Sequence, residues 1–136
     1  QQENISVTLA SNKLKNIFLN ISTDNFTTEN NGLLARLDEI SNIVEQSGGH
    51  IERKGSFTNN GLSAEELLAI GLQRSSEIPR YRFDLYINET KTSHENPNFI
   101  ISLDNEGSSA IPYEQGELIA FWDSITRTIR LRPNSF

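Results

Sequence analysis

Polar and apolar residues alternate near the start of the chain, which is the pattern of a half-buried β-strand. Ile5, Val7 and Leu9 alternate with serine and threonine, so the sequence predicts a strand here. Residues 13–21 fit both an alternating strand and a helical stripe, and the sequence leaves their state open. The Asn- and Thr-rich stretch 23–31 is predicted to be a loop.

Two later segments have the spacing of amphipathic helices. In residues 32–47 apolar side chains recur every three or four positions, and Gly48 offers a backbone on which a helix can end. Ser63 and Glu66 have the spacing of a capping box, in which each side chain bonds the exposed N–H of the other residue. The sequence therefore predicts one helix over residues 32–47 and a second from Ser63 to about Arg74.

A period of two predicts strands over most of the remaining chain. The predicted strands are residues 50–57, 80–88, 99–103, 117–122 and 125–131. The last two flank Asp123 and Ser124 at the spacing of a tight hairpin. Because a sheet must bury one face and a helix one stripe, this order predicts an α+β fold. Two helices would pack on one face of a mostly antiparallel sheet that ends in a C-terminal β-hairpin.

Length and charge narrow the class of protein. The chain has 136 residues, a length that fits one domain over residues 1–136. Its formal charge is −6, from 12 Lys+Arg and 18 Asp+Glu, which argues against nucleic-acid binding. Its apolar runs are too short to predict a membrane-spanning segment. Because the first residue is Gln1, we expect a mature chain or the soluble part of a longer precursor, in an extracytoplasmic location (periplasmic or secreted).

The residue types that bond-making chemistry requires are scarce. The sequence has no cysteine, and its two histidines, His50 and His94, lack the spacing of metal ligands. Aspartates on or beside predicted strands leave a small carboxylate-dependent hydrolase as the enzymatic alternative. These are Asp84, Asp104 and Asp123. Residues 104–107 match only part of a calcium loop. We therefore predict no enzyme, no catalytic residue, no metal site and no cofactor.

Four arginines are the main candidates for a binding surface. Arg80 and Arg82 project from one face of a predicted strand, and Arg130 and Arg132 from one face of the last one. If these strands are neighbours, four guanidiniums share the uncovered face of the sheet and could bind an acidic partner. The alternative is that they pair with carboxylates across the sheet. Trp122 joins the binding set as a candidate exposed aromatic, with a purely core role as the other possibility.

Three functions are compatible with these residues. The first is a non-enzymatic protein–protein interaction module outside the cytoplasm, such as a subunit of a cell-envelope or surface assembly. The predicted layout resembles the soluble parts of pilin-type or secretion-apparatus subunits, a resemblance of layout that implies no site residue. The alternative is an acidic immunity or inhibitor protein that neutralises a toxin or enzyme by binding it. The third is the hydrolase. In the first two the partner is another protein, whose identity stays open, as does the oligomeric state.

Overall fold

The computed structural model describes residues 4–10, 17–24, 32–59, 61–72, 79–88, 98–105 and 113–130. The strands in these ranges are β1 (Asn4–Ala10), β2 (Phe18–Asp24), β3 (His50–Asn59), β4 (Leu62–Leu72), β5 (Pro79–Ile87) and β6 (Asn98–Asp104). A 3₁₀ turn, η1 (Leu34–Arg36), leads into helix α1 (Leu37–Gln46), and helix α2 (Gln115–Thr126) follows the last strand. None of the helices in these ranges has the length and apolar character needed to cross a membrane.

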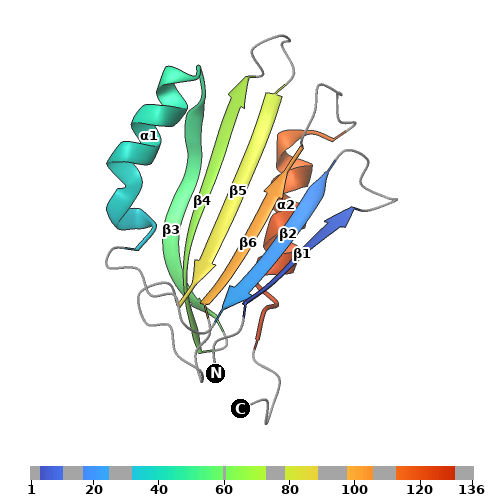
Figure 1. The fold of residues 1–136 in the computed structure, drawn as a ribbon. Helices are drawn as coiled ribbons and strands as arrows, with labels where there is room; N and C mark the ends of the chain where they lie inside the picture. Colours follow the sequence, from blue (N-terminus) through green and yellow to red (C-terminus); the bar gives the residue numbers. More distant parts are fainter. Residues whose placement is uncertain are drawn as a thin grey trace.

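All six strands form one antiparallel sheet in the order β1-β2-β6-β5-β4-β3, with β1 and β3 at its edges (Figure 1). The α+β class and the antiparallel sheet are therefore confirmed. The strand predictions over residues 5–9, 50–57 and 99–103 are confirmed as well, and the one over 80–88 is confirmed up to Ile87, where β5 ends. Residues 18–21 are strand rather than helix, while residues 13–16 and most of the predicted loop lie outside the described residues.

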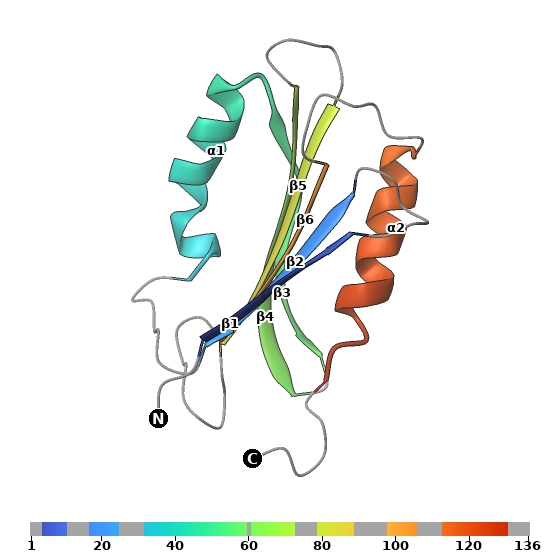
Figure 2. The same ribbon diagram turned by 45° about the vertical axis from the view of Figure 1, so that its right-hand side comes forward.

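The two helices lie on opposite sides of the sheet (Figure 2), so the prediction that both cover one face is wrong. Helix α1 contacts β3 and β4 at one end of the sheet, where Leu33 and Leu67 are buried. Helix α2 covers the other side, and its Leu118 and Trp122 belong to the hydrophobic core. The prediction failed because the second helix is a different segment of the chain from the one expected.

The segment predicted as a helix from Ser63 is strand β4. It pairs with β3 on one side and with β5 on the other, and Gly61, at φ +80°, makes the turn that enters it from β3. Its buried side chains on the α2 side are Leu62, Ala64, Glu66, Leu68 and Ile70. A helix cap contributes only about 1 kcal/mol, so two strand interfaces and this buried row outweigh the capping-box spacing of Ser63 and Glu66.

The predicted C-terminal hairpin is also wrong, because residues 115–126 form helix α2. Leu118, Trp122 and Thr126 are four residues apart and are its buried side chains. Glu114 and Glu117 form a capping box at its start. Every position from Leu118 to Trp122 is apolar, so a short window fits a period of two as well as a helical stripe.

The core lies between α2 and the side of the sheet that it covers. Phe83 and Leu85, on the inner strand β5, are 0% exposed. The ring of Phe83 meets that of Trp122 edge to face, with the centroids 5.8 Å apart. One side of β5 is therefore buried under α2, while its other side carries the arginines considered next.

Candidate protein-binding face

Arg80 and Arg82 lie two residues apart on β5 and project from the α1 side of the sheet, opposite the buried Tyr81 and Phe83. Both arginines are exposed, and the side chain of Arg82 is 52% accessible. The pairing of these two arginines on one face is therefore as predicted. Arg80 forms no ion pair with the residues that the structure describes.

The second predicted pair of arginines is placed differently. Arg130 is exposed and follows α2, next to Ile129, which packs against the core on the α2 side. It therefore does not lie on a strand beside β5, and the predicted face of four arginines does not form. The prediction fails because residues 115–126 form helix α2 and not a hairpin. No C-terminal strand therefore places Arg130 beside Arg82. Arg132 lies outside the described residues.

Arg82 is held by a cross-strand network. Its Nε donates to Oδ1 of Asp84 (3.2 Å), its Nη1 to Oδ2 of Asp104 (3.4 Å) and its Nη2 to Oγ of Ser102 (3.4 Å). Ser102 in turn donates to Asp84 Oδ1 at 2.7 Å. Burial opposes the charged form of Arg82, but the two carboxylates outweigh it and raise the pKa of the guanidinium. The alternative of pairing across the sheet is thus confirmed for Arg82.

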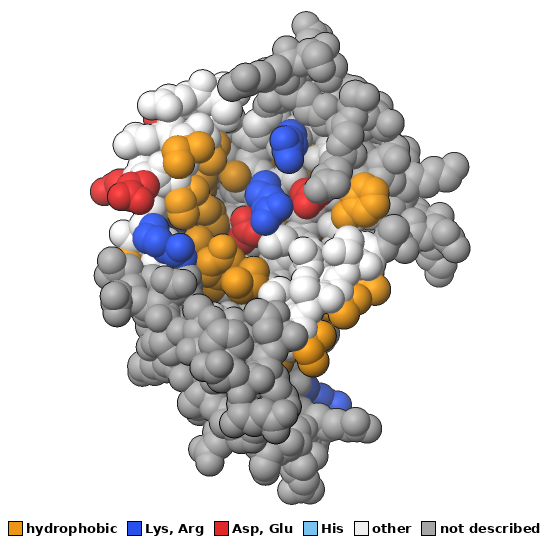
Figure 3. Space-filling model, viewed as in Figure 1, with side chains coloured by type: hydrophobic (Ala, Val, Ile, Leu, Met, Phe, Trp, Pro, Cys, Tyr) orange, Lys and Arg blue, Asp and Glu red, His pale blue; other side chains and the backbone are white. Residues whose placement is uncertain are grey.

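We call Arg80, Arg82, Asp84, Ser102 and Asp104 the charged face. Figure 3 shows the molecule from this side: basic and acidic side chains lie close together over the middle of the sheet. A strip of apolar side chains lies next to them, toward α1. We call the half-buried apolar residues of η1 and α1 the apolar strip; they are Leu34, Leu37, Ile40 and Val44.

Two contacts join η1, which precedes α1, to the sheet. The backbone N–H of Leu34 donates to Glu65 Oε2 at 2.7 Å. The guanidinium of Arg36 lies 5.7 Å from the ring centroid of Tyr86, in the range of a cation–π contact. Arginine, tyrosine and apolar side chains therefore lie side by side on the α1 side of the sheet, a composition typical of protein interfaces.

Trp122 does not belong to this surface. Its side chain is 0% exposed, and its Nε1 donates to Glu66 Oε2 at 2.9 Å inside the core. The prediction of an exposed aromatic at this position is wrong, and the purely core role is confirmed. On a helix, Trp122 turns toward the sheet with Leu118 and Thr126 rather than alternating with its neighbour.

A buried ion cluster, which sequence reasoning missed, joins α2 to the sheet. Glu66, with a side chain only 3% exposed, accepts from Arg53 Nε (2.9 Å) and from two nitrogens of Arg127 (2.7 and 3.0 Å). Arg53 also pairs with Asp123 of α2 through both of its terminal nitrogens. The available signal is a charged residue in an otherwise apolar row of β4, which the capping-box spacing of Ser63 and Glu66 obscures.

The charges in this cluster stabilise one another. Burial raises the pKa of Glu66, but the hydrogen bonds from Arg127 and Trp122 and the nearby positive charges outweigh it, so the pKa lies below its ordinary value. The hydrogen bond from Arg53 is the largest cause that lowers the pKa of Asp123. Both carboxylates therefore stay ionised in the folded protein at neutral pH.

The three aspartates considered for acid–base chemistry do not converge. Asp84 and Asp104 share Arg82 on the α1 side of the sheet, whereas Asp123 pairs with Arg53 at α2. Asp84 and Asp104 thus share one guanidinium and Asp123 pairs with another, which is an arrangement of ion pairs rather than a carboxylate pair facing a common substrate.

Ligand sets for a metal are likewise absent from the part of the chain that the structure describes. His50 is exposed and contacts Glu52 at 3.0 Å. His94 and the end of the calcium-loop match, residues 106–107, lie outside the described residues.

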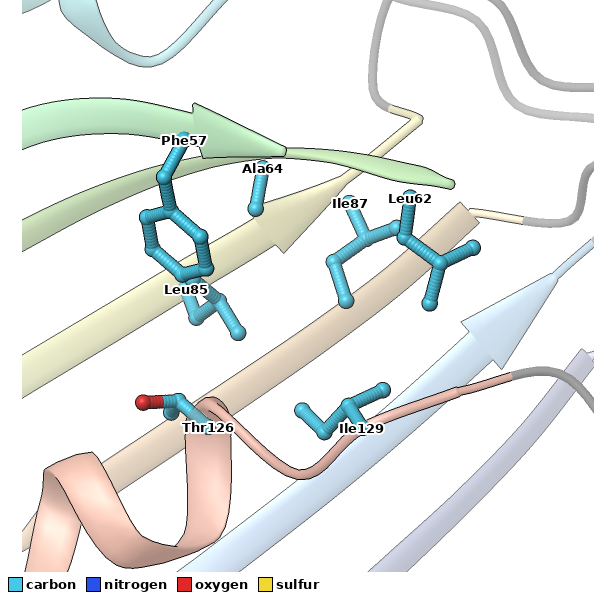
Figure 4. Close-up of a pocket in the computed structure, with 7 residues that line it drawn as sticks. All are labelled: Phe57, Leu62, Ala64, Leu85, Ile87, Thr126 and Ile129. Atoms are coloured by element: carbon cyan, nitrogen blue, oxygen red, sulfur yellow. The ribbon is translucent and has the colours of Figure 1, made fainter. Parts of the chain in front are cut away.

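A small apolar pocket with no room for a water molecule lies near the end of α2 (Figure 4). Its lining residues are Phe57, Leu62, Ala64, Leu85, Ile87, Thr126 and Ile129. The hydroxyl of Thr126 donates to the carbonyl of Trp122 at 2.9 Å, so the polar side chain in the lining is already engaged. The pocket offers apolar contact and no group for chemistry.

Comparisons with known proteins give a family and a set of similar structures. A family model described as the Tle cognate immunity protein 4 C-terminal domain matches residues 1–134. No curated protein matches the sequence.

Among solved structures, the chain is similar to the apo immunity protein TplEi of T6SS from Pseudomonas aeruginosa, with a TM-score of 0.84 and 24% identity. That match covers 99% of this chain and 46% of the other. The same protein complexed with "L" peptide gives 0.82 and 24%, over 98% and 49%. A crystal structure of the Tle4-Tli4 complex gives 0.82 and 24%, over 99% and 47%. The chain therefore spans about half the length of these structures, and at this identity they support the fold.

Proposed function

The chain belongs to the family of Tle cognate immunity protein 4 C-terminal domains, and we propose that it binds a cognate toxin and neutralises it. The observation that carries this proposal is the family match over residues 1–134. It favours the immunity-protein hypothesis over the subunit of a surface assembly, the first of the three functions that the sequence predicts.

Neutralisation by binding rather than by catalysis is the mechanism that the residues support best. One of the similar structures is a Tle4-Tli4 complex, so a protein of this fold binds another protein. In this chain the aspartates that might have served as acid and base are each paired with arginine. We propose that the partner is a toxin of the Tle kind.

We propose that the toxin contacts the charged face and the apolar strip beside α1. Arg80 has no partner among the described residues, so it can form a bidentate pair with a carboxylate of the toxin without losing an internal bond. Arg82 is already oriented by Asp84 and Asp104, which lowers the entropy lost when a partner is bound. The apolar strip next to them can exclude water from such pairs. Arg130 stays a predicted contact on a separate surface. Arg132, outside the described residues, also stays a predicted contact.

We further propose that the protein acts outside the cytoplasm, in the periplasm. The similar immunity protein TplEi is described as a protein of T6SS, a secretion system. The sequence has no cysteine, so folding does not depend on the redox state of the compartment. Fractionation of cells that carry a tagged copy tests this location.

Calorimetric titration of the protein with its cognate toxin tests the binding proposal. We expect Arg80→Ser to raise the Kd at least tenfold, about 1.4 kcal/mol, and to leave thermal unfolding unchanged because Arg80 makes no internal ion pair. Arg130→Ser is the matched comparison on the α2 side. A larger effect of Arg130→Ser would place the contact on the other surface, and absence of binding by the unsubstituted protein would overturn the proposal itself.

A further inference from the structure

The two edges of the sheet are built differently. Edge strand β3 carries charged residues and a register shift between Ile51 and Arg53, features that discourage pairing with another strand. Edge strand β1 has the sequence NISVTLA, with no charge, no proline and no glycine. It pairs with β2 without a register shift over all seven residues, and the described residues provide no strand on its outer side. β1 thus has the features of a strand that another strand can extend.

The exposure of the β1 side chains supports the same conclusion. Ile5, Val7 and Leu9 are 58%, 45% and 49% exposed, although they lie on the α2 side of the sheet. The register places Val7 opposite Ile21 and Leu9 opposite Leu19, two residues that pack against the core. Three large apolar side chains therefore extend the core beyond the area that α2 covers, in an arrangement typical of a surface that is buried in the working protein.

We propose that β1 is covered by the other half of a longer protein, through an uncharged strand with apolar side chains that continues the sheet. The solved structures that the chain matches are about twice its length, and the family is described as a C-terminal domain. A covalently attached domain is present at high effective concentration, so it can cover an edge of this size. The inference rests on the family and not on the proposed toxin contact.

The alternative occupants are less favoured by charge and by position. A net charge of −6 opposes the approach of a second copy of the chain. The apolar side chains of β1 face the α2 side of the sheet, whereas Arg80 and Arg82 face the α1 side. A domain on β1 therefore leaves the charged face free for the toxin.

Maleimide labelling of the full-length protein tests the proposal, because the domain has no cysteine of its own. Val7→Cys places a thiol on the apolar side of β1, and Thr8→Cys places one on the other side of the same strand, at an exposed position. With labelling mapped by mass spectrometry, we expect Val7→Cys to react at least tenfold more slowly than Thr8→Cys. Hydrogen exchange of the unsubstituted protein is a second measurement, in which the β1 amides should be protected as strongly as those of β2.

Each other result overturns the proposal in a distinct way. Equal labelling rates together with fast exchange of β1 would show that nothing covers the strand. Faster labelling of Val7→Cys on dilution would identify a second copy as the occupant. Protection of β1 that arises only when the toxin is added would identify the toxin as the occupant of β1. In that case the proposal that the protein binds a toxin would still hold.

Discussion

Glu66 shows how one buried carboxylate can organise a fold. A carboxylate has about four acceptor sites, and all four are used here. Oε1 accepts from Arg53 and Arg127, and Oε2 accepts from Trp122 and Arg127. Two guanidiniums and an indole, from β3, from α2 and from the residue that follows α2, therefore converge on a single side chain. A buried charge is costly unless it is paired and hydrogen-bonded, and this one is both.

Replacing Glu66 by glutamine removes the charge and keeps the shape. We expect Glu66→Gln to lower the free energy of unfolding by about 2 kcal/mol, because two arginines lose the negative charge that they share. Both arginines are partly exposed, so water compensates for part of the lost interaction. Urea unfolding at pH 7 measures the effect. Glu52→Gln, at an exposed position of β3, is the control and should change stability by less than about 0.5 kcal/mol.

Gly49 marks a point where two backbones meet. A Cβ at this position would lie 2.5 Å from the carbonyl oxygen of Ile70 and 2.9 Å from Cα of Gly71. Backbone atoms cannot move aside as a flexible side chain can, so we expect Gly49→Ala to destabilise the protein by about 1–3 kcal/mol. Gly55→Ala on β3 is the matched control, since nothing lies within 4 Å of the added Cβ. Thermal unfolding of the two variants compares them, and equal melting temperatures would contradict the close approach.

At the scale of elements, the two helices are attached with unequal strength. Helix α2 buries Leu118, Trp122 and Thr126 and is joined to the sheet by the Glu66 cluster. Helix α1 has no buried residue of its own, and its main contacts with the sheet are with β3 and β4. An element with few buried contacts opens at lower free-energy cost than one that is part of the core.

Hydrogen exchange should therefore distinguish the helices. We expect the amides of α1 to exchange at least tenfold faster than those of α2 under native conditions, because α1 can open without disturbing the core. Exchange monitored by mass spectrometry on peptides from residues 37–46 and 115–126 gives the comparison. Equal rates would mean that both helices open only when the whole sheet unfolds.

Local patterns predicted those elements whose pattern fits a single type of structure. Residues 80–85 alternate strictly and lie in β5, and residues 37–46 have a helical stripe and form α1. The pattern failed at β4 and α2, where apolar residues are so frequent that either period fits. Two long-range features decide between helix and strand there: β4 pairs with two strands, and α2 covers the core. Neither feature can be detected in a short stretch of sequence.

The candidate site was predictable to the same extent. That Arg80 and Arg82 share a face follows from alternation along one strand, and this part is confirmed. Which residues lie next to them depends on which strand pairs with β5. Its neighbours are β4 and β6, with Asp104 of β6 opposite Arg82, and neither is the strand predicted at the C-terminus. The partners of Glu66 lie 13 to 61 positions away in the chain, so no local pattern could have revealed the cluster.

For the whole molecule, the ion cluster ties stability to pH. The pKa values of Glu66 and Asp123 are lower in the folded chain than their ordinary values of 4.5 and 3.8. Unfolding in acid is then accompanied by proton uptake, so the stability that these groups contribute is complete above about pH 4.5. It is lost as the pH falls through the lower pKa values of the folded state.

The free energy of unfolding should therefore change little between pH 7 and pH 5 on account of these groups, and should decrease below pH 4.5. Urea unfolding of the protein and of Glu66→Gln at a series of pH values tests this expectation. Because the variant has no carboxylate at position 66 to protonate, we expect its stability to fall less steeply in acid, so that the two curves converge toward pH 3. Parallel curves over this range would show that protonation of Glu66 does not drive the loss, and that the cluster joins α2 to the sheet without making the fold sensitive to acid.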